Sequence, residues 1–363
     1  MDSDREAARA AFLAQAGLAA AARDPLPGDA STRRYERLRT PGGATLILMD
    51  APPSAESVPC DPAATPQQRL AAGYNASARL AAGRVDAFAA CAAYLSGRGL
   101  SAPRIEALDA AQGLAITEDL GEGVYARLID AGQSEPDLYF AAVDALAALH
   151  AEAPPAALPV GDGAWPLLAY DDLALKTGAD LFVEWLPRLD PRLRIGAQAA
   201  AEWEALWAPI RARGEAGATV FAHRDYHAEN LLWLPQRDGA ARVGMVDFQD
   251  ALRAHPSWDL HSLLQDARRD VWPELEAAAL SRYLAARPPA DQDAFLADYA
   301  ALAALNEARI IGVFARLIVR DGKPRYRAFL PRMWRQLERN LAAPQMKGLK
   351  AWFDRHVPAE TRT

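Results

Sequence analysis

The stretch of the sequence richest in candidate chemistry carries Asp225 and Asn230 five residues apart, and Asp247 farther along. Asn230 precedes an apolar run at 231–234, and Asp247 follows a second apolar run at 242–246. An Asp-Gly pair between the two runs is a strong hairpin signal. If the runs pair antiparallel, Asn230 and Asp247 become neighbours about 5 Å apart across the ladder.

A carboxamide and a carboxylate that converge in this way offer the hard oxygen ligands that Mg²⁺ prefers. Asp225, on the loop that leads into the hairpin, would accept or orient a hydroxyl proton, a role worth roughly 10²–10⁴ in rate. The order of base, metal ligand and metal ligand in D-x-x-x-x-N, hairpin, D-F is that of kinases. The pattern therefore predicts phosphoryl transfer, with catalytic Asp225 and the metal ligands Asn230 and Asp247.

Simpler interpretations exist for each residue taken singly. Asp225 could be a solvated loop carboxylate, and His223 is expected to brace the turn rather than to catalyse. His223 and His227 are four residues apart, as zinc ligands on a helix can be, but no Glu follows the first and no third ligand is evident. Asp259 could cap a helix or hydrogen-bond the catalytic loop. The joint pattern favours a phosphotransferase site over these alternatives.

The N-terminal half of the chain has no lysine before Lys176. Kinases of the familiar kind hold the α- and β-phosphates with a strand lysine, and Met49 or Asp50 falls at about that position. The phosphate charge would then be balanced by Mg²⁺ and by Arg33 or Arg34, because arginine can clamp phosphate bidentately. Two alternatives stay open: both arginines are solvated, or the chain has lost catalysis.

The remaining nucleotide contacts are expected from two loops. Small residues just before Arg33 would let backbone N–H groups approach phosphates, helped by the Ser31 and Thr32 hydroxyls. The run 114–121 is typical of a strand that enters a turn. In a kinase-like fold the backbone around Glu118 and Leu120 would meet adenine.

Composition sets broader limits. A chain of 363 residues with 51% hydrophobic and 24% charged residues is typical of a globular enzyme of one or two domains. A net charge of -7 argues against a nucleic-acid partner. Two cysteines give no disulfide framework, and no apolar run is long enough to span a membrane. We expect a cytoplasmic monomer that acts on a small molecule.

Periodicity and turn signals predict the elements. We expect strands over 33–38 and 44–49, and helices over 4–22, 86–95, 136–150, 171–175, 181–186, 197–213 and from 257 onward. Loose segments are expected at 51–82, partly helical near its end, and at 151–163. His150, at the end of its helix, is expected to be structural.

Several motifs resemble a known family. His223-x-Asp225 through Asn230, with Asp247-Phe248, resemble the aminoglycoside phosphotransferase/choline kinase superfamily. Further segments look like those of the cell-wall-recycling anomeric N-acetylmuramate/N-acetylglucosamine 1-kinases, namely 29–35, 48–53, 117–121, 181–185, 247–251, 312–317 and 320–324. The resemblance covers about residues 29 to 335. The chain departs from it at 305–309, where a Gln-Arg-containing run is expected, and in a longer excursion at 54–82.

The resemblance implies an α+β, protein-kinase-like bilobal fold. Its small β-rich N-lobe would span 1–118, with an N-terminal helix before a nucleotide-covering hairpin. A mainly helical C-lobe would span 119–363, with the catalytic loop and a substrate-covering insertion around 160–195.

The implied activity is ATP- and Mg²⁺-dependent phosphorylation of the C1 hydroxyl of N-acetylmuramic acid or N-acetylglucosamine in peptidoglycan recycling. A uridylyltransferase would use the product. Candidate substrate contacts are Glu184, Asp250 and Arg316. Two alternatives remain: another small-molecule kinase of the aminoglycoside, choline or homoserine type, for which Asp171, Asp172 and Glu184 could form an acidic pocket, and a non-catalytic nucleotide-binding pseudokinase.

Overall fold

The computed structural model describes residues 2–27, 33–52 and 59–362 of the chain. The chain forms two compact units. The first unit comprises Met1–Leu149, Pro155–Leu168 and Ala228–Ala251, and the second comprises His150–Pro154, Ala169–His227 and Leu252–Thr363. Among the helices of the described residues, none has the length and apolar character needed to cross a membrane.

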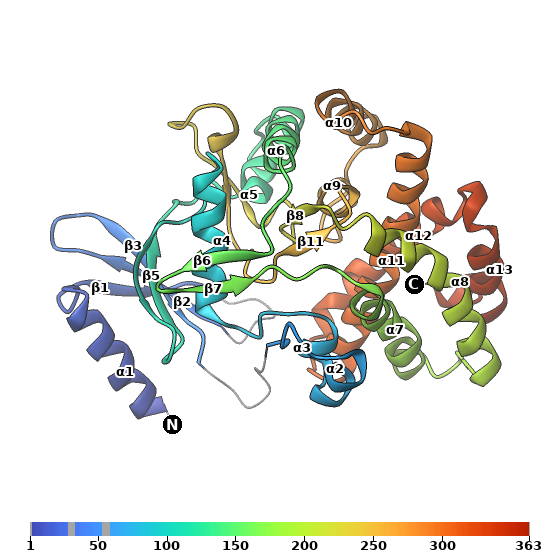
Figure 1. Cartoon of the computed structure of the whole chain (residues 1–363), viewed down its shortest axis with the longest axis horizontal. Helices are drawn as coiled ribbons and strands as arrows, with labels where there is room; N and C mark the ends of the chain where they lie inside the picture. Colours follow the sequence, from blue (N-terminus) through green and yellow to red (C-terminus); the bar gives the residue numbers. More distant parts are fainter. Residues whose placement is uncertain (1, 28–32, 53–58, 363) are drawn as a thin grey trace. The chain divides into compact units, whose positions relative to one another are not determined.

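The first unit is built on a five-stranded antiparallel sheet in the order β1-β2-β3-β5-β4 (Figure 1). Its strands are β1 (Ala22–Pro25), β2 (Arg34–Arg39), β3 (Thr45–Asp50), β4 (Ile105–Asp109) and β5 (Leu114–Glu118). The strands predicted over 33–38, 44–49 and 114–121 are confirmed. Leu38, Leu48 and Ile116 form one apolar face, on which Phe12 and Leu13 of helix α1 (Asp2–Gln15) pack.

Helix α1 is shorter than predicted, because the expected helix over 4–22 ends at Gln15. Gly17 adopts a left-handed φ of 73° just after the last turn, and the backbone N–H of Leu18 donates to the Leu13 carbonyl at 2.8 Å. Such a glycine stops a helix at little cost because it has no Cβ. The released chain then forms β1 beside β2, where Arg23 of β1 donates to Glu36 of β2 at 2.5 Å.

The rest of the first unit consists of helices and two small hairpins. They are α2 (Pro66–Ala72), α3 (Tyr74–Ser77), α4 (Val85–Gly97), α5 (Tyr125–Asp130), α6 (Glu135–Leu149), β6 (Ala157–Val160), β7 (Gly163–Pro166), β9 (Leu231–Trp233), η1 (Gly239–Arg242) and β10 (Val243–Met245). Helices α4 and α6 and the helical end of the 51–82 excursion are confirmed.

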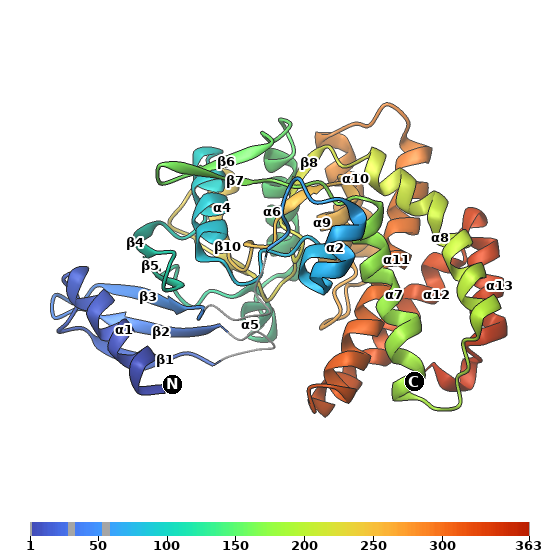
Figure 2. The same cartoon turned by 60° about the horizontal axis from the view of Figure 1, so that its bottom comes forward.

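The hairpin β6–β7 was not predicted, because 151–163 was expected to be a loop. Its strands pair from Ala157–Pro166 to Val160–Gly163, and it lies beside α4 (Figure 2). Pro159 and Pro166 hide the strand pattern in the sequence. Leu158 is fully buried, so packing against the unit, rather than propensity, accounts for the strand.

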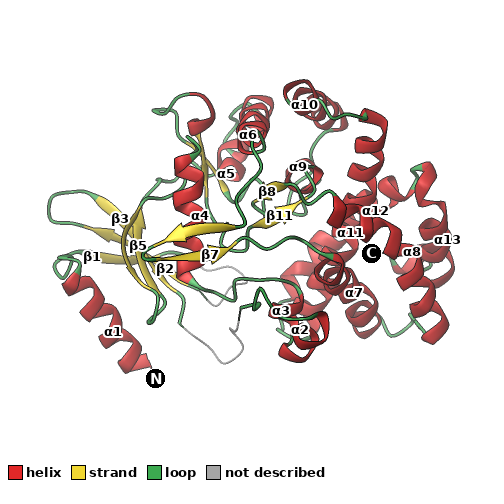
Figure 3. Ribbon diagram, in the orientation of Figure 1, coloured by secondary structure: helices red, strands yellow, loops and turns green. Residues whose placement is uncertain are grey.

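The second unit is largely helical (Figure 3). Its elements are α7 (Asp172–Leu189), α8 (Ala197–Ala216), β8 (Val220–Ala222), β11 (Leu252–Ala254), α9 (Ser257–Leu264), α10 (Pro273–Ala286), α11 (Gln292–Val319), η2 (Pro324–Phe329), α12 (Leu330–Leu341), η3 (Pro344–Met346), α13 (Lys347–His356) and η4 (Ala359–Thr361). As predicted, Trp203 and Trp207 of α8 face inward. The Trp203 ring stacks on Phe182 at 5.2 Å and lies 4.8 Å from Trp352.

The two short helices predicted at 171–175 and 181–186 are wrong, because α7 is one continuous helix. Gly178, inside this helix, serves close packing: a Cβ on Gly178 would lie 3.0 Å from the Arg309 side chain of α11. One helical turn away, a Cβ on Gly312 would lie 2.4 Å from the backbone of Leu181 and Phe182. Gly312 therefore lets α11 approach the backbone of α7, and Gly178 makes room for the Arg309 side chain of α11.

Candidate active site

The predicted hairpin forms in the first unit and brings Asn230 and Asp247 to the same end. Met245 pairs with Leu231, and beyond this pair the Val246 N–H donates to the Asn230 carbonyl at 3.1 Å. Asp247 follows directly and has a left-handed φ of 67°. A carboxylate held in this rarely adopted conformation is the kind of local strain that clusters at functional sites.

Neighbouring segments of the first unit fix the hairpin on both sides. The Trp233 N–H donates to the Gly123 carbonyl at 2.7 Å, and the Met245 N–H donates to the Ser101 carbonyl at 2.8 Å. A Cβ on Gly123 would lie 2.6 Å from the Trp233 carbonyl oxygen, so this contact requires glycine. The hairpin is thus a firm platform for the two side chains at its end.

Arg33 lies against the Asp247 carboxylate. Its Nη2 donates to Asp247 Oδ1 at 2.6 Å, and its side chain is only 12% exposed. Burial opposes the charge on Arg33, but the carboxylates of Asp247 and Asp250 outweigh burial and raise the pKa of the guanidinium. Burial also raises the pKa of the nearby Tyr35 phenol to about 12. The negative charges of Asp247 and Asp250 therefore favour a cation next to Asp247.

The other residues predicted to contact phosphate are Arg34, Ser31 and Thr32. Arg34 begins β2, and its backbone pairs with Asp50. Since side chains alternate along a strand, Arg34 and Tyr35 project from opposite faces of the sheet. Ser31 and Thr32 lie outside the described residues.

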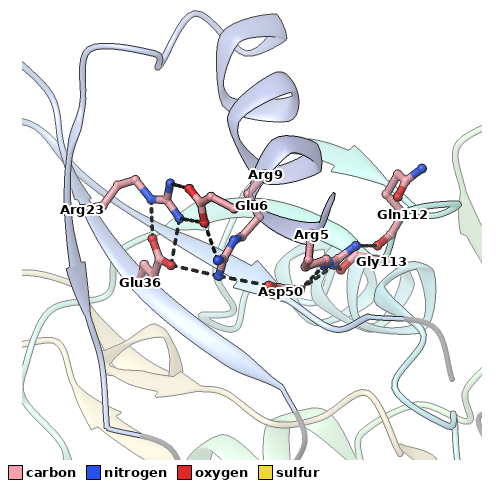
Figure 4. Close-up of polar contacts among 8 residues, drawn as sticks. All are labelled: Arg5, Glu6, Arg9, Arg23, Glu36, Asp50, Gln112 and Gly113. Atoms are coloured by element: carbon pink, nitrogen blue, oxygen red, sulfur yellow. Dashed lines mark hydrogen bonds and ion pairs between the residues drawn. The ribbon is translucent and has the colours of Figure 1, made fainter. Parts of the chain in front are cut away.

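A polar cluster beside α1 shows which face of the sheet Asp50 occupies (Figure 4). Arg5 donates to Asp50 Oδ1 through Nε at 2.8 Å, and Arg9 donates to Asp50 Oδ2 at 3.3 Å. The Asp50 side chain therefore points to the face of the sheet on which α1 packs. Met49 must project from the opposite face, the face of its strand partner Tyr35. Met49 is buried, and its thioether cannot bind phosphate by charge.

The predicted adenine segment follows β5. Arg237 donates to Glu118 at 2.7 Å, while the Glu118 N–H donates to the Arg104 carbonyl at 2.8 Å. Leu120 reaches the second hairpin strand, where a Cβ on Gly244 would lie 3.2 Å from its Cδ1. The segment is thereby fixed beside β10, and its role with adenine stays a prediction.

Gln249 and Asp250 lie on the same loop as Asp247. Gln249 Nε2 donates to Asp247 Oδ1 at 3.2 Å, and Asp250 Oδ1 accepts the Ala81 N–H at 2.6 Å. The Phe248 ring stacks on Phe88 of α4 at 4.6 Å. Asp250 therefore binds the backbone at the end of the 51–82 excursion, and its contact with substrate stays a prediction. The sequence did not assign a role to Gln249, although it replaces the glycine of the kinase D-F-G motif.

The loop that carries Asp225 belongs to the second unit. It follows β8, which pairs with β11. The buried Asp259 of α9 accepts the His223 N–H at 2.6 Å and the Arg224 N–H at 2.8 Å, so the predicted bond to the catalytic loop is confirmed. Arg224 has a left-handed φ of 79°, and Asp225 is the next residue. Burial raises the pKa of Asp259 to about 7, although these two hydrogen bonds oppose the shift.

The second unit also contains His227, Glu184, Arg316 and Glu307. Arg268 Nη1 lies 3.2 Å from His227 Nε2, a contact that no local sequence signal indicated. Glu184 is half-exposed and lies 3.5 Å from Arg188, while Arg316 lies on α11. In the departure at 305–309, Glu307 is buried and accepts from Asn340 at 2.9 Å.

A magnesium site fits the donors present. Among residues 2–27, 33–52 and 59–362, no group of three or more His, Cys, Asp or Glu side chains is arranged to hold a metal. Mg²⁺, however, is commonly held by only one or two protein ligands together with water and substrate phosphates. Asn230 and Asp247 at one end of a hairpin match this mode, and the guanidinium on Asp247 shows that the carboxylate receives a cation. The assignments of Asp225, Asn230 and Asp247 stay predictions.

Known proteins are similar to this chain in sequence and in fold. The phosphotransferase enzyme family matches residues 23–305, and the chain therefore belongs to that family. The N-acetylmuramate/N-acetylglucosamine kinase of Caulobacter vibrioides is 62% identical over 362 residues, which cover 100% of this chain and 99% of the relative. The Pseudomonas aeruginosa kinase of the same name is 31% identical over 326 residues, with 88% and 83% of the two chains covered.

A solved structure supports the fold. A choline/ethanolamine kinase family protein from Mesorhizobium loti superposes with a TM-score of 0.56 at 16% identity, covering 97% of this chain and 99% of that chain. The predicted α+β kinase-like fold class and the predicted family are thus confirmed.

Proposed function

We propose that the protein transfers the γ-phosphoryl group of ATP to the anomeric C1 hydroxyl of N-acetylmuramic acid or N-acetylglucosamine. The observation that carries this proposal is the 62% identity, over the whole chain, to a kinase named for these two sugars. The site supports the reaction class, because Asn230 and Asp247 offer oxygen ligands at one end of a fixed hairpin.

The chain's own residues have distinct tasks in this proposal. Asp225 receives or orients the proton of the attacking hydroxyl, on a loop fixed by Asp259. Asn230 and Asp247 hold Mg²⁺, which neutralises charge that develops on the transferred phosphoryl group. Arg33 supplies the positive charge that the absent lysine would give. Ser31 and Thr32 contact the phosphates, and the backbone near Glu118 and Leu120 contacts adenine.

The proposal also describes the protein's setting. The enzyme acts as a cytoplasmic monomer in peptidoglycan recycling, and a uridylyltransferase consumes its sugar 1-phosphate. The lobes are divided near residue 118, and the region around 160–195 covers the sugar.

A direct assay tests the proposal. The purified protein is given ATP and Mg²⁺ with N-acetylmuramic acid, N-acetylglucosamine or an aminoglycoside, and both ADP release and formation of acid-labile 1-phosphate are measured. Turnover of the N-acetyl sugars is expected, with loss of turnover in Asp225→Ala and when Mg²⁺ is omitted. Turnover of the aminoglycoside alone would refute the substrate assignment. ATP binding without turnover, equal in the wild type and Asp225→Ala, would indicate a pseudokinase.

A further inference from the structure

A series of hydrogen bonds within the first unit links Asp247 to the connection between α3 and α4. Gln249 Nε2 donates to Asp247 Oδ1 at 3.2 Å and to Asp250 Oδ2 at 3.4 Å. The other carboxylate oxygen of Asp250, Oδ1, accepts the backbone N–H of Ala81 at 2.6 Å. These contacts, the Gln249 bridge, run without a gap from the Ala81 backbone to the Asp247 carboxylate.

A glutamine side chain is well suited to a place between two carboxylates. Asp247 and Asp250 repel each other when both are ionised, and an ionised carboxylate can only accept hydrogen bonds. A carboxamide nitrogen carries two hydrogens, so the single NH₂ group of Gln249 can serve both side chains at once. Gln249 is only 3% exposed. Burial raises the cost of breaking either contact, because bulk water does not replace the lost partner.

Both ends of the Gln249 bridge lie on strained backbone. Asp247 has a left-handed φ of 67°. At the other end, Arg79 and Ala82 have left-handed φ angles of 55° and 56° on either side of Ala81. Residues with a Cβ persist in this conformation only where the surrounding contacts hold them, and such strain clusters at functional sites. The strained turn presents the Ala81 N–H to Asp250, and the bridge helps to hold Asp247 in its unusual conformation.

We propose that Gln249 is a positioning residue that holds the Asp247 carboxylate for the metal, an inference that rests on the proposed function. Asp250, bound to the Ala81 N–H, serves as the anchor of Gln249. The amide of Gln249 is neutral, whereas Arg33, which also donates to Asp247 Oδ1, is charged. A cation that binds Asp247 therefore repels the guanidinium but not the amide. Loss of such a partner of a metal ligand typically lowers metal affinity by roughly 10- to 100-fold.

Two substitutions break the Gln249 bridge in different ways. Gln249→Met keeps the length of the side chain and removes the NH₂ group. Gln249→Asn keeps the amide but is one methylene group shorter, so its NH₂ group cannot span both carboxylates. Gln336→Met is the matched control, because Gln336 Nε2 also donates at 3.2 Å, to the Asp266 carbonyl, but lies on α12 in the second unit.

Calorimetry with a non-hydrolysable ATP analogue measures metal binding without turnover. In both Gln249 variants, the Mg²⁺ concentration that half-saturates the nucleotide complex should rise by roughly 10- to 100-fold. The affinity for the nucleotide without Mg²⁺ should stay within about threefold of the wild-type value, because the amide acts through the metal ligand. Gln336→Met should stay within about threefold of the wild type in both measurements, because its site is independent of the bridge.

The other possible results each contradict a part of the reasoning. An unchanged Mg²⁺ requirement in both Gln249 variants would mean that Asp247 is positioned without the amide, and the inference would be wrong. An equal loss of nucleotide affinity with and without Mg²⁺ would also overturn it, because the metal would then not be the cause. A loss in Gln249→Met but not in Gln249→Asn would exclude a bridge that needs both carboxylates.

Folding and the proposed function are controlled separately. If circular dichroism shows that Gln249→Met is unfolded, the asparagine variant decides. If the wild type phosphorylates neither N-acetyl sugar but Mg²⁺ binding changes as expected in the variants, the proposed function is refuted and the positioning role of Gln249 is supported.

Discussion

Replacement of Asp259 by asparagine tests how the catalytic loop is held. In the wild type, Oδ2 accepts the His223 N–H at 2.6 Å and Oδ1 accepts the Arg224 N–H at 2.8 Å. Asparagine can accept only one of these bonds, and its NH₂ group faces the other donor. One buried N–H then loses its partner, at a cost of about 2 kcal/mol. The left-handed Arg224 is released, so Asp225 is displaced, and a shift of about 1 Å can lower kcat by about 100-fold.

The effect of Asp259→Asn on stability should change sign with pH. Burial raises the folded-state pKa of Asp259 from 3.8 to about 7. A group with a raised folded-state pKa contributes its full stability below its unfolded pKa and loses it as pH rises through the folded value. The total loss is about 4 kcal/mol, at 1.36 kcal/mol for each pKa unit. The wild type should therefore be the more stable protein at pH 4, and the variant the more stable one at pH 8.

Urea unfolding from pH 4 to 8 and steady-state kinetics measure both effects. Asp291→Ala is a matched control, because Asp291 also accepts a backbone N–H, that of Ala294 at 2.9 Å, but caps α11 rather than the catalytic loop. It should lose about 1 kcal/mol of stability and keep its kcat. A stability difference between Asp259→Asn and the wild type that does not vary with pH, together with an unchanged kcat, would refute this account of the loop.

Two further predictions concern packing and charge. Gly312→Ala places a methyl group 2.4 Å from the backbone of α7, which cannot move aside like a flexible side chain, so the free energy of unfolding should fall by about 3 kcal/mol in urea titrations; an unchanged midpoint would mean that α7 and α11 separate easily. Arg33→Gln removes the cation 2.6 Å from Asp247. Without nucleotide, Mg²⁺ should then bind about tenfold more tightly in calorimetry, because its competitor is gone, whereas KM for ATP should rise; equal Mg²⁺ affinity in both proteins would exclude this competition.

Local signals were sufficient for the hairpin that carries Asn230 and Asp247. Its two apolar runs are close in sequence, and their pairing places the polar residues at one end whatever surrounds them. The pattern of residues that predicts strands β2 and β3 is also a short-range one. The alternation could not show which face of the sheet Asp50 takes, because that depends on α1, whose Arg5 and Arg9 bind Asp50.

The sequence by itself determined the reaction class and most of the helices and strands, because these follow from short-range spacing and periodicity. Only the tertiary structure decided that α7 is one continuous helix, in which Gly178 makes room for the Arg309 side chain of α11. It also decided the orientation of the Gln249 amide, which is set by two carboxylates that accept hydrogen bonds and cannot donate them. Packing and hydrogen-bond polarity depend on which groups meet in space, and that information is absent from local patterns.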